Sequence, residues 1–119
     1  MILKKEELLL ADNGIVGAIP SEIVKLNKLK VFDYSSNFIT GTIPSGIGNL
    51  KQLVVWNAAF NQQNGVLPTY IGQLTALQTF HLAMNQFSGT LPTQMGKMLE
   101  LGMLTLCFVG VVVVVAISC

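Results

Sequence analysis

The sequence predicts an α/β-type solenoid, with short parallel β-strands on a concave face and irregular or 3-10 segments on the convex face. Three sets of residues predict it, because asparagine, glycine and proline each recur at an interval of 24 residues. These sets are Asn13, Asn37, Asn61 and Asn85; Gly17, Gly41, Gly65 and Gly89; and Pro20, Pro44, Pro68 and Pro92. A fixed period of about 20 to 50 residues is the signature of a repeat architecture, in which each unit packs on its neighbours.

Apolar residues keep the same interval and predict the core. Two of these columns are Leu8, Phe32, Trp56, Phe80 and Leu104, and Leu26, Leu50, Leu74 and Met98. Within one unit, Phe32 and Tyr34 are two residues apart, so on a strand their side chains point to the same face. We therefore expect both to face inward, and we expect Ile47 to return the chain to the core.

The residues that follow each strand predict how the chain turns. Asn37 carries an amide that both donates and accepts hydrogen bonds. Gly41 suits a tight bend, where a Cβ atom is costly. Pro44 fixes φ and lacks a backbone donor, so it prevents a long α-helix on the convex side. Gly48 and Gly72 are expected to let neighbouring turns approach closely.

One complete unit, residues 26–50, reads LNKLKVFDYSSNFITGTIPSGIGNL. It resembles the leucine-rich repeat, in particular the plant-type 24-residue subclass marked by Gly-x-(Ile/Leu)-Pro, over about residues 8–106. The resemblance implies a right-handed superhelix like the ectodomains of leucine-rich-repeat receptor-like proteins and kinases. It also implies that the asparagine column, Asn13, Asn37, Asn61 and Asn85, forms a ladder that satisfies backbone groups in the loops. We place the array at residues 1–106, with repeats starting near residues 8, 26, 50, 74 and 98.

Composition excludes several functional classes. The chain has 119 residues, enough for one domain, and a net charge of +1, so no electrostatic argument favours nucleic acid. All seven cationic residues are lysines, so no arginine can clamp a phosphate or carboxylate in bidentate fashion. No phosphate-binding glycine motif occurs. His81 is the only histidine, and with Asp33 two strands away it forms neither a triad nor a metal site. We expect no enzyme activity, no cofactor and no metal.

The N-terminal stretch MILKKEELLLADNG lacks the features of a signal peptide, because its only apolar run, Leu8 to Leu10, is short and follows two glutamates. The first strand of the array starts almost at once. We therefore expect either a fragment of a longer array or a minimal charged cap formed by Lys4, Lys5, Glu6 and Glu7. Cys107 and Cys119 define no disulfide framework.

The C-terminal segment, residues 101–119, contains no charged residue. As a helix it would span about 28 Å, close to the hydrocarbon thickness of a bilayer. It is therefore a candidate transmembrane helix that would place the protein at a membrane. However, Leu101, Leu104 and Leu106 keep the repeat register, which favours a last buried strand. A frameshifted terminus is the third alternative.

The side chains that point away from the core on the strands, and those just before each asparagine, vary between repeats. Variable positions on a constant scaffold are where a binding site is expected. The candidate ligand contacts on the concave face are Asp33, Ser36, Asn57, Phe60, His81 and Met84. Phe60 and Met84 would form an exposed apolar spot beside a polar row, although they could also pack only on one another.

We therefore expect a module that binds a protein or peptide on its concave face. The resemblance implies part of a membrane-associated, receptor-like signalling protein. Two alternatives stay open. One is a soluble inhibitor or structural protein of the same fold, such as a polygalacturonase-inhibiting or ice-binding repeat protein. The other is a truncated, non-functional gene fragment.

Overall fold

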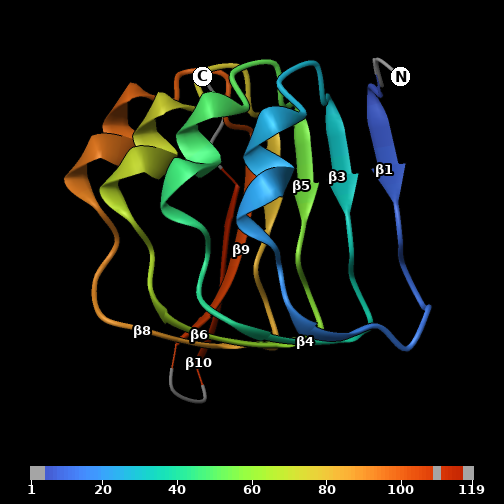
Figure 1. The fold of residues 1–119 in the computed structure, drawn as a ribbon. Coiled ribbons are helices and arrows are strands. Elements are labelled where there is room, and N and C mark those ends of the chain that lie inside the picture. The colour runs from blue at the N-terminus through green and yellow to red at the C-terminus, as the bar shows by residue number, and fades with distance from the viewer. Residues whose placement is uncertain (1–4, 109–110, 117–119) are drawn as a thin grey trace.

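Short strands stack side by side into a six-stranded sheet that forms the concave face (Figure 1). The computed structural model describes residues 5–108 and 111–116. The sheet contains, in spatial order, β1 (Glu7–Leu9), β3 (Val31–Asp33), β5 (Val55–Asn57), β7 (Thr79–His81), β9 (Met103–Phe108) and β10 (Val111–Ala116). All neighbouring strands from β1 to β9 are parallel, and only β10 runs antiparallel to its neighbour. This arrangement confirms the predicted solenoid.

The strand register repeats every 24 residues, as the apolar columns require. Phe32 pairs with Trp56, Trp56 with Phe80, and Phe80 with Leu104. Equivalent side chains therefore stack on one another, and the rings of Trp56 and Phe80 lie 4.6 Å apart in a stacked arrangement. Such offset aromatic contacts add to the hydrophobic stabilisation of the core.

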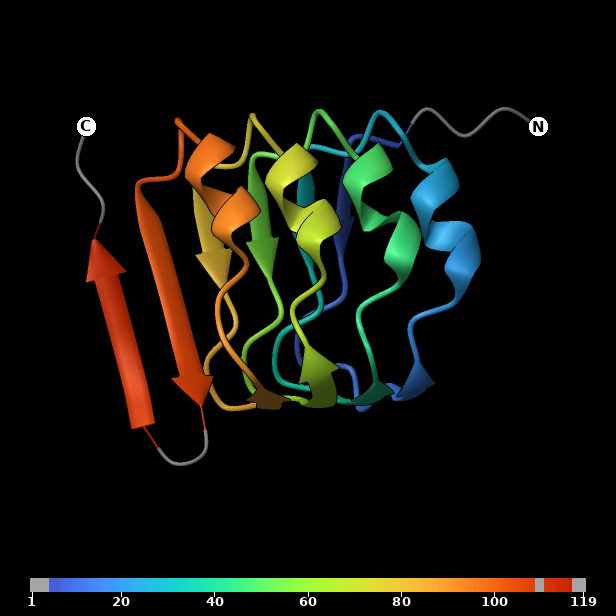
Figure 2. The same cartoon turned by 90° about the vertical axis from the view of Figure 1, so that its left-hand side faces the viewer.

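A second set of short strands and a row of 3-10 helices complete each turn of the solenoid (Figure 2). The second sheet contains β2 (Val16–Ala18), β4 (Phe38–Gly41), β6 (Gln62–Val66) and β8 (Gln86–Ser88). The helices are η1 (Ser21–Lys25), η2 (Ser45–Asn49), η3 (Thr69–Gln73) and η4 (Thr93–Lys97). A proline precedes each helix, and its carbonyl accepts the first i→i+3 bond, as in Ile47 N–H to Pro44 O at 3.1 Å.

The core runs along the whole stack between the two faces. Side chains that are completely excluded from solvent include Tyr34, Ile47, Leu50, Leu53, Trp56, Ile71, Leu74, Leu77, Phe80 and Leu82. The first repeat differs, because no described repeat packs on its outer side. Several apolar residues near the N-terminal end of the array are therefore only partly buried. They are Leu8, Leu10, Ile15, Ile19 and Leu26.

The residues of the predicted charged cap lie at the N-terminal end of the array. Lys5, Glu6 and Glu7 are exposed beside the first repeat, and Glu6 lies 3.7 Å from the ammonium group of Lys30. Lys4 and Cys119 lie outside the described residues.

The core also contains a polar cluster that the apolar columns do not predict. Gln63 replaces the apolar residue expected at its position and is fully buried. Its Oε1 accepts a hydrogen bond of 2.7 Å from the Tyr34 hydroxyl, which in turn accepts one of 3.2 Å from Trp56 Nε1. Tyr34 comes from one repeat and Trp56 and Gln63 from the next, so this cluster ties two neighbouring repeats together through directional contacts.

Burial of the Tyr34 phenol predicts a loss of stability at alkaline pH. Burial raises the pKa of Tyr34 above its ordinary value of 10, while the hydrogen bonds from Trp56 and to Gln63 act in the opposite sense. The folded state therefore holds the phenol proton more tightly than the unfolded chain. This contribution is complete below about pH 10 and is lost as the pH rises further.

Between pH 10 and pH 11 we expect Tyr34 to lower the free energy of unfolding by about 1 kcal/mol. Urea unfolding at both pH values measures this change, and Tyr34→Phe removes the ionising group. The wild-type chain should lose more stability over this interval than the variant. Equal losses in the two proteins would show that other groups cause the alkaline destabilisation.

Residues 103–108 and 111–116 of the C-terminal segment form strands, which corrects the prediction of a transmembrane helix for these residues. β9 adds to the edge of β7 in the 24-residue register, and Leu101, Leu104 and Leu106 are buried like their equivalents in earlier repeats. β10 then pairs with β9, with Val111 opposite Phe108. The edge of β7 offers hydrogen bonds and a place in the core, and these favour a strand. In residues 5–108 and 111–116, we find no helix of sufficient length and apolar character to cross a membrane.

Candidate ligand-binding site

A row of polar side chains crosses the concave sheet at the C-terminal ends of its strands. Asp33 pairs with Asn57, Asn57 with His81, and His81 with Thr105 in the strand register. These side chains point away from the core and are half-buried. The row was predicted as far as His81. Thr105, one period of 24 residues further on, was missed, although the interval itself points to it.

Most members of the row are held in place by hydrogen bonds. Asp33 Oδ1 accepts bonds from the Ser35 backbone N–H at 3.0 Å and the Ser35 hydroxyl at 2.7 Å. Asn57 Oδ1 accepts the Ala59 N–H at 3.1 Å. His81 Nδ1 lies 3.0 Å from Thr105 Oγ1. These bonds restrict side-chain rotation, so a ligand would meet a surface that is largely ordered in advance.

The residue before each ladder asparagine adopts a left-handed backbone conformation. Ser36, Phe60 and Met84 have φ values of 56°, 59° and 59°. This conformation costs about 1 to 2 kcal/mol for a residue with a Cβ atom. It turns the chain at the rim of the sheet and leaves the side chains in solvent, with Phe60 57% and Met84 49% exposed. Two large apolar side chains thus occupy strained, exposed positions.

A shallow hollow of about 370 Å³ lies where the row meets this rim. It is lined by Ser35, Ser36, Asn57, Ala59, Phe60, His81, Ala83 and Thr105. Of the six predicted contact residues it brings together Ser36, Asn57, Phe60 and His81. Asp33 and Met84 do not line it, although Asp33 holds the Ser35 side chain that does. The alanines provide a low floor between the polar row and the Phe60 ring.

The asparagine column lies on the core side of the same turns. Asn61 Nδ2 donates to the backbone oxygens of Tyr34, Ala58 and Ala59, and its Oδ1 accepts the Ile39 N–H at 3.0 Å. Asn37 and Asn85 make the equivalent donor bonds. Asn13 is exposed, and its side chain donates only to the Ala11 oxygen. Asn37 and Asn61 are buried and position the rim, so they are not available to a ligand.

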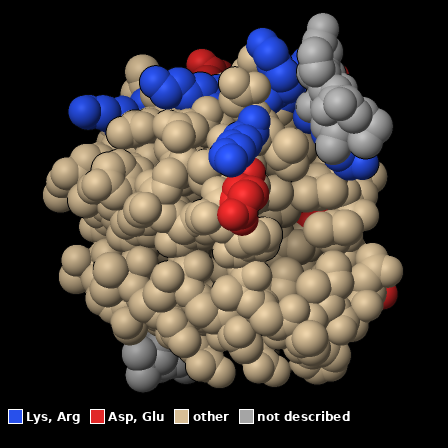
Figure 3. Space-filling view, in the orientation of Figure 1, with Lys and Arg blue, Asp and Glu red and all other residues tan. Residues whose placement is uncertain are grey.

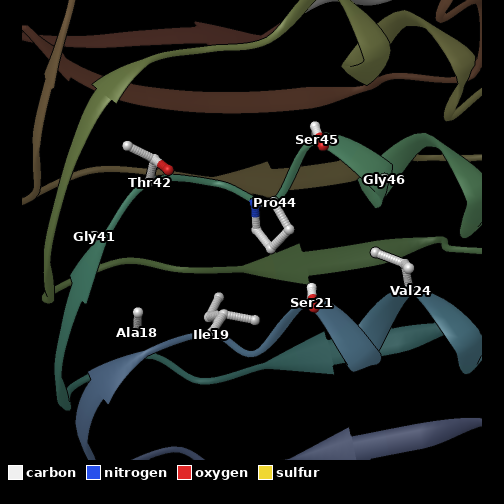
Figure 4. Close-up of a pocket in the computed structure, with 9 residues that line it drawn as sticks. All are labelled: Ala18, Ile19, Ser21, Val24, Gly41, Thr42, Pro44, Ser45 and Gly46. Atoms are coloured by element: carbon white, nitrogen blue, oxygen red, sulfur yellow. The ribbon is translucent and has the colours of Figure 1, made fainter.

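A larger hollow of about 690 Å³ lies on the outer side, between the first two repeats (Figure 4). It exists because small side chains, such as Ala18, face the bend at Gly41 and because Gly46 faces Val24. Its lining contains no charged, amide or imidazole group. It therefore offers fewer directional contacts than the hollow on the concave face, despite its greater volume.

Within the part of the chain that the structure describes, no three His, Cys, Asp or Glu residues gather as a metal site would require. His81 contacts Thr105 and Asp33 contacts Ser35, so these two residues do not form a pair. The concave surface presents apolar contact area and fixed hydrogen-bonding groups.

Comparison with known proteins gives a consistent result. The family model described as Leucine Rich Repeat matches residues 28–50 and 76–98. No curated protein matches the chain. Among solved structures, the chain is similar to the ectodomain of the plant membrane receptor kinase GASSHO1/SCHENGEN3 from Arabidopsis thaliana, solved in complex with CASPARIAN STRIP INTEGRITY FACTOR 2. The identity is 37% and the TM-score 0.79, over 80% of this chain and 11% of that chain.

Two further solved structures are similar to this chain. One is the Arabidopsis receptor kinase HAESA in complex with the peptide hormone IDA and the co-receptor SERK1, at 36% identity and a TM-score of 0.74, over 76% of this chain and 15% of that chain. The other is the BIR3–SERK2 complex from Arabidopsis thaliana, at 32% identity and a TM-score of 0.75, over 79% of this chain and 50% of that chain. The chain thus spans half or less of the length of each of these structures.

Proposed function

Because this chain is a plant-type leucine-rich repeat protein, similar to the ectodomains of plant receptor kinases, we propose that it is a ligand-binding module. Its ligand is a peptide or a short protein segment that binds on the concave face. The observation that carries this proposal is the hollow beside Phe60, where an exposed aromatic ring in a strained conformation borders a row of ordered polar groups.

Strain at an exposed apolar residue supports a binding role. Asparagine or glycine would adopt a φ of 59° at lower cost than phenylalanine. An exposed ring also gains little from burial within the chain itself. A ligand that covers the Phe60 ring would bury its apolar surface and so offset the backbone strain and the exposure.

The size and chemistry of the hollow indicate what it takes. About 370 Å³ accommodates one or two side chains rather than the surface of a globular partner. The floor of Ala59 and Ala83 suits an apolar side chain, which would pack against Phe60. Asn57, His81 and Thr105 would then exchange hydrogen bonds with the main chain of the same segment. Such binding depends little on ionic strength, because none of the residues that line the hollow is Asp, Glu, Lys or Arg.

The relatives support the same class of ligand. The HAESA structure contains the peptide hormone IDA, and the GASSHO1/SCHENGEN3 structure contains CASPARIAN STRIP INTEGRITY FACTOR 2. We propose a binding role without catalysis for this chain, because Asp33 and His81 are each engaged by a neighbour and do not form a proton-transfer pair. Association with a membrane is a further part of the proposal. Its support is the membrane receptor kinase among the relatives. The C-terminal segment does not add to this support, because its residues 103–108 and 111–116 are strands.

Substituting Phe60 tests the proposed site. A peptide selected from a random library on the immobilised chain should bind Phe60→Ala about 30-fold more weakly, as expected for an aromatic residue at the centre of an interface. Isothermal titration calorimetry measures both affinities. Phe38→Ala is the matched control, because Phe38 is similarly exposed, at 55%, but lies on β4 in the other sheet.

Phe60→Asn separates binding from folding. Asparagine tolerates the left-handed conformation, so this variant should be more stable than the wild type by about 1 kcal/mol while binding more weakly. A loss of binding that accompanies a gain in stability cannot come from unfolding. If Phe38→Ala and Phe60→Ala weaken the peptide equally, the concave hollow is not its site.

A further inference from the structure

A second polar hollow lies on the opposite side of the solenoid from the concave sheet. Its volume is about 380 Å³, and its lining residues come from two adjacent repeats, residues 50–73 and 74–97. We call it the lysine groove and define it by Lys51, Thr69, Tyr70, Gln73, Gln94 and Lys97. η3 and η4 form its floor, and the turn that follows η2 contributes Lys51.

The lysine groove is lined by two cationic side chains in a part of the chain that has few charged residues. Between Tyr34 and Gly96, Lys51 is the only charged residue. No acidic residue lines the groove, and the one salt bridge found within the described residues joins Lys30 to Glu6, in the first two repeats. Figure 3 shows the lysine side chains along the upper edge of the molecule, whereas most of the face below carries no charge. Among the described residues, neither Lys51 nor Lys97 forms a salt bridge, and the acidic residue nearest to Lys97 in the chain is Glu100.

Neutral hydrogen-bonding groups fill the space between the two cations. Gln73 and Gln94 come from adjacent repeats, and each amide can both donate and accept. Thr69 adds a hydroxyl. Tyr70 lies in the same groove and leaves 47% of its surface in solvent. A flat aromatic face, amides and a hydroxyl in one open groove suit a ligand with apolar ring faces and many hydroxyl groups.

The spacing of the cations limits the ligand further. Lys51 lies in the turn after η2 and Lys97 at the C-terminal end of η4, so η3 lies between the two cations. An extended ligand with acidic groups at intervals can place one near each lysine while its body lies over Tyr70 and the glutamines.

We propose that the lysine groove binds an acidic oligosaccharide, with carboxylates at Lys51 and Lys97 and a sugar ring against Tyr70. This site is separate from the concave hollow and does not depend on the peptide-binding role. Lysine acts as a point charge, and both lysines are exposed, so binding is weak and falls as ionic strength rises.

Titration of the full chain with a uronate hexasaccharide, followed by backbone amide NMR at low ionic strength, tests this proposal. A neutral glucose hexasaccharide, hexaglutamate and inorganic sulfate are the comparison probes. We expect saturable shifts around Tyr70, Gln73 and Lys97 with the uronate oligomer, and weaker effects from the other three. An exposed charge contact contributes up to about fivefold in affinity. The double variant Lys51→Gln, Lys97→Gln should therefore bind the uronate oligomer about tenfold more weakly than the wild type. Tyr70→Ala should weaken it further.

Lys28→Gln is the matched control, because it removes one exposed lysine outside the groove. It should leave the affinity within about twofold of wild type. The proposal is overturned if the uronate oligomer gives no saturable shifts, or if Lys28→Gln weakens binding as much as Lys51→Gln, which would indicate general charge attraction. Hexaglutamate binding as tightly as the uronate would assign the groove to acidic peptides. Equal binding by sulfate would reduce it to an anion site.

Discussion

Asn61→Ala should lower the free energy of unfolding by about 3 kcal/mol. Asn61 is 8% exposed, and its amide serves two neighbouring repeats at once. Its Oδ1 is the acceptor for the buried Ile39 N–H, and its Nδ2 donates to the backbone oxygens of Tyr34, Ala58 and Ala59. The substitution leaves a buried donor unpaired, which costs about 1 to 3 kcal/mol, and removes several further bonds.

Asn13→Ala is the matched control for this substitution. Asn13 has the same place in the first repeat, but it is exposed and its side chain makes one bond, to the Ala11 oxygen. We expect it to change stability by no more than about 0.5 kcal/mol. Urea unfolding followed by far-UV circular dichroism and by the fluorescence of Trp56, the only tryptophan, measures both variants. Similar small losses at the two positions would show that the ladder does not stabilise the array.

Gly72→Ala should cost about 3 kcal/mol, since overpacking against an unyielding neighbour carries penalties of this order. A Cβ atom at Gly72 would overlap the backbone carbonyl of Gln94 in the next repeat, with the carbonyl carbon only 2.8 Å away. Neither backbone can move without disturbing the stacking of η3 on η4. The prediction that Gly72 allows neighbouring turns to approach closely therefore has a measurable consequence.

The same column supplies a graded series. At Gly48 an added Cβ would meet the flexible Gln73 side chain at 2.5 Å and the Tyr70 oxygen at 2.8 Å, so we expect a smaller loss than at Gly72. At Gly96 nothing lies within 4 Å, and alanine should be neutral or stabilising by about 0.5 kcal/mol, because it restricts the unfolded chain. Thermal and urea unfolding of the three variants should rank them in this order. A loss at Gly96 equal to that at Gly72 would point to backbone conformation rather than close approach.

The candidate site shows which aspects of side-chain placement follow from the sequence and which do not. Asn57, Phe60 and His81 were identified because they vary at positions whose direction the 24-residue interval defines, and they line one hollow. Met84 follows the same rule and is exposed, yet it does not line the hollow. The interval specifies which face a side chain occupies. It does not specify how far that side chain reaches from its backbone, which depends on the rotamer and on the neighbours.

The sequence by itself determined the features that recur in every repeat. The positions of the strands, the turn asparagines and the prolines before each 3-10 helix follow from local conformational preferences and from one interval. So do the glycines Gly17, Gly41, Gly65 and Gly89, whose φ values are positive. Each repeat meets the same neighbours, so a single unit describes the whole stack.

Only the tertiary structure decided the features that occur once. Residues 101–119 satisfy the pattern of a membrane helix and that of a strand, and the edge of β7 decides for strands in residues 103–108. Gln63 is buried where the Tyr34 hydroxyl, from the preceding repeat, donates a hydrogen bond to its Oε1. Lys51 and Lys97 share a groove only because the stacking of η3 on its neighbours brings the turn after η2 and the end of η4 to one edge. These outcomes depend on contacts between residues far apart in the chain, and a local pattern cannot encode such contacts.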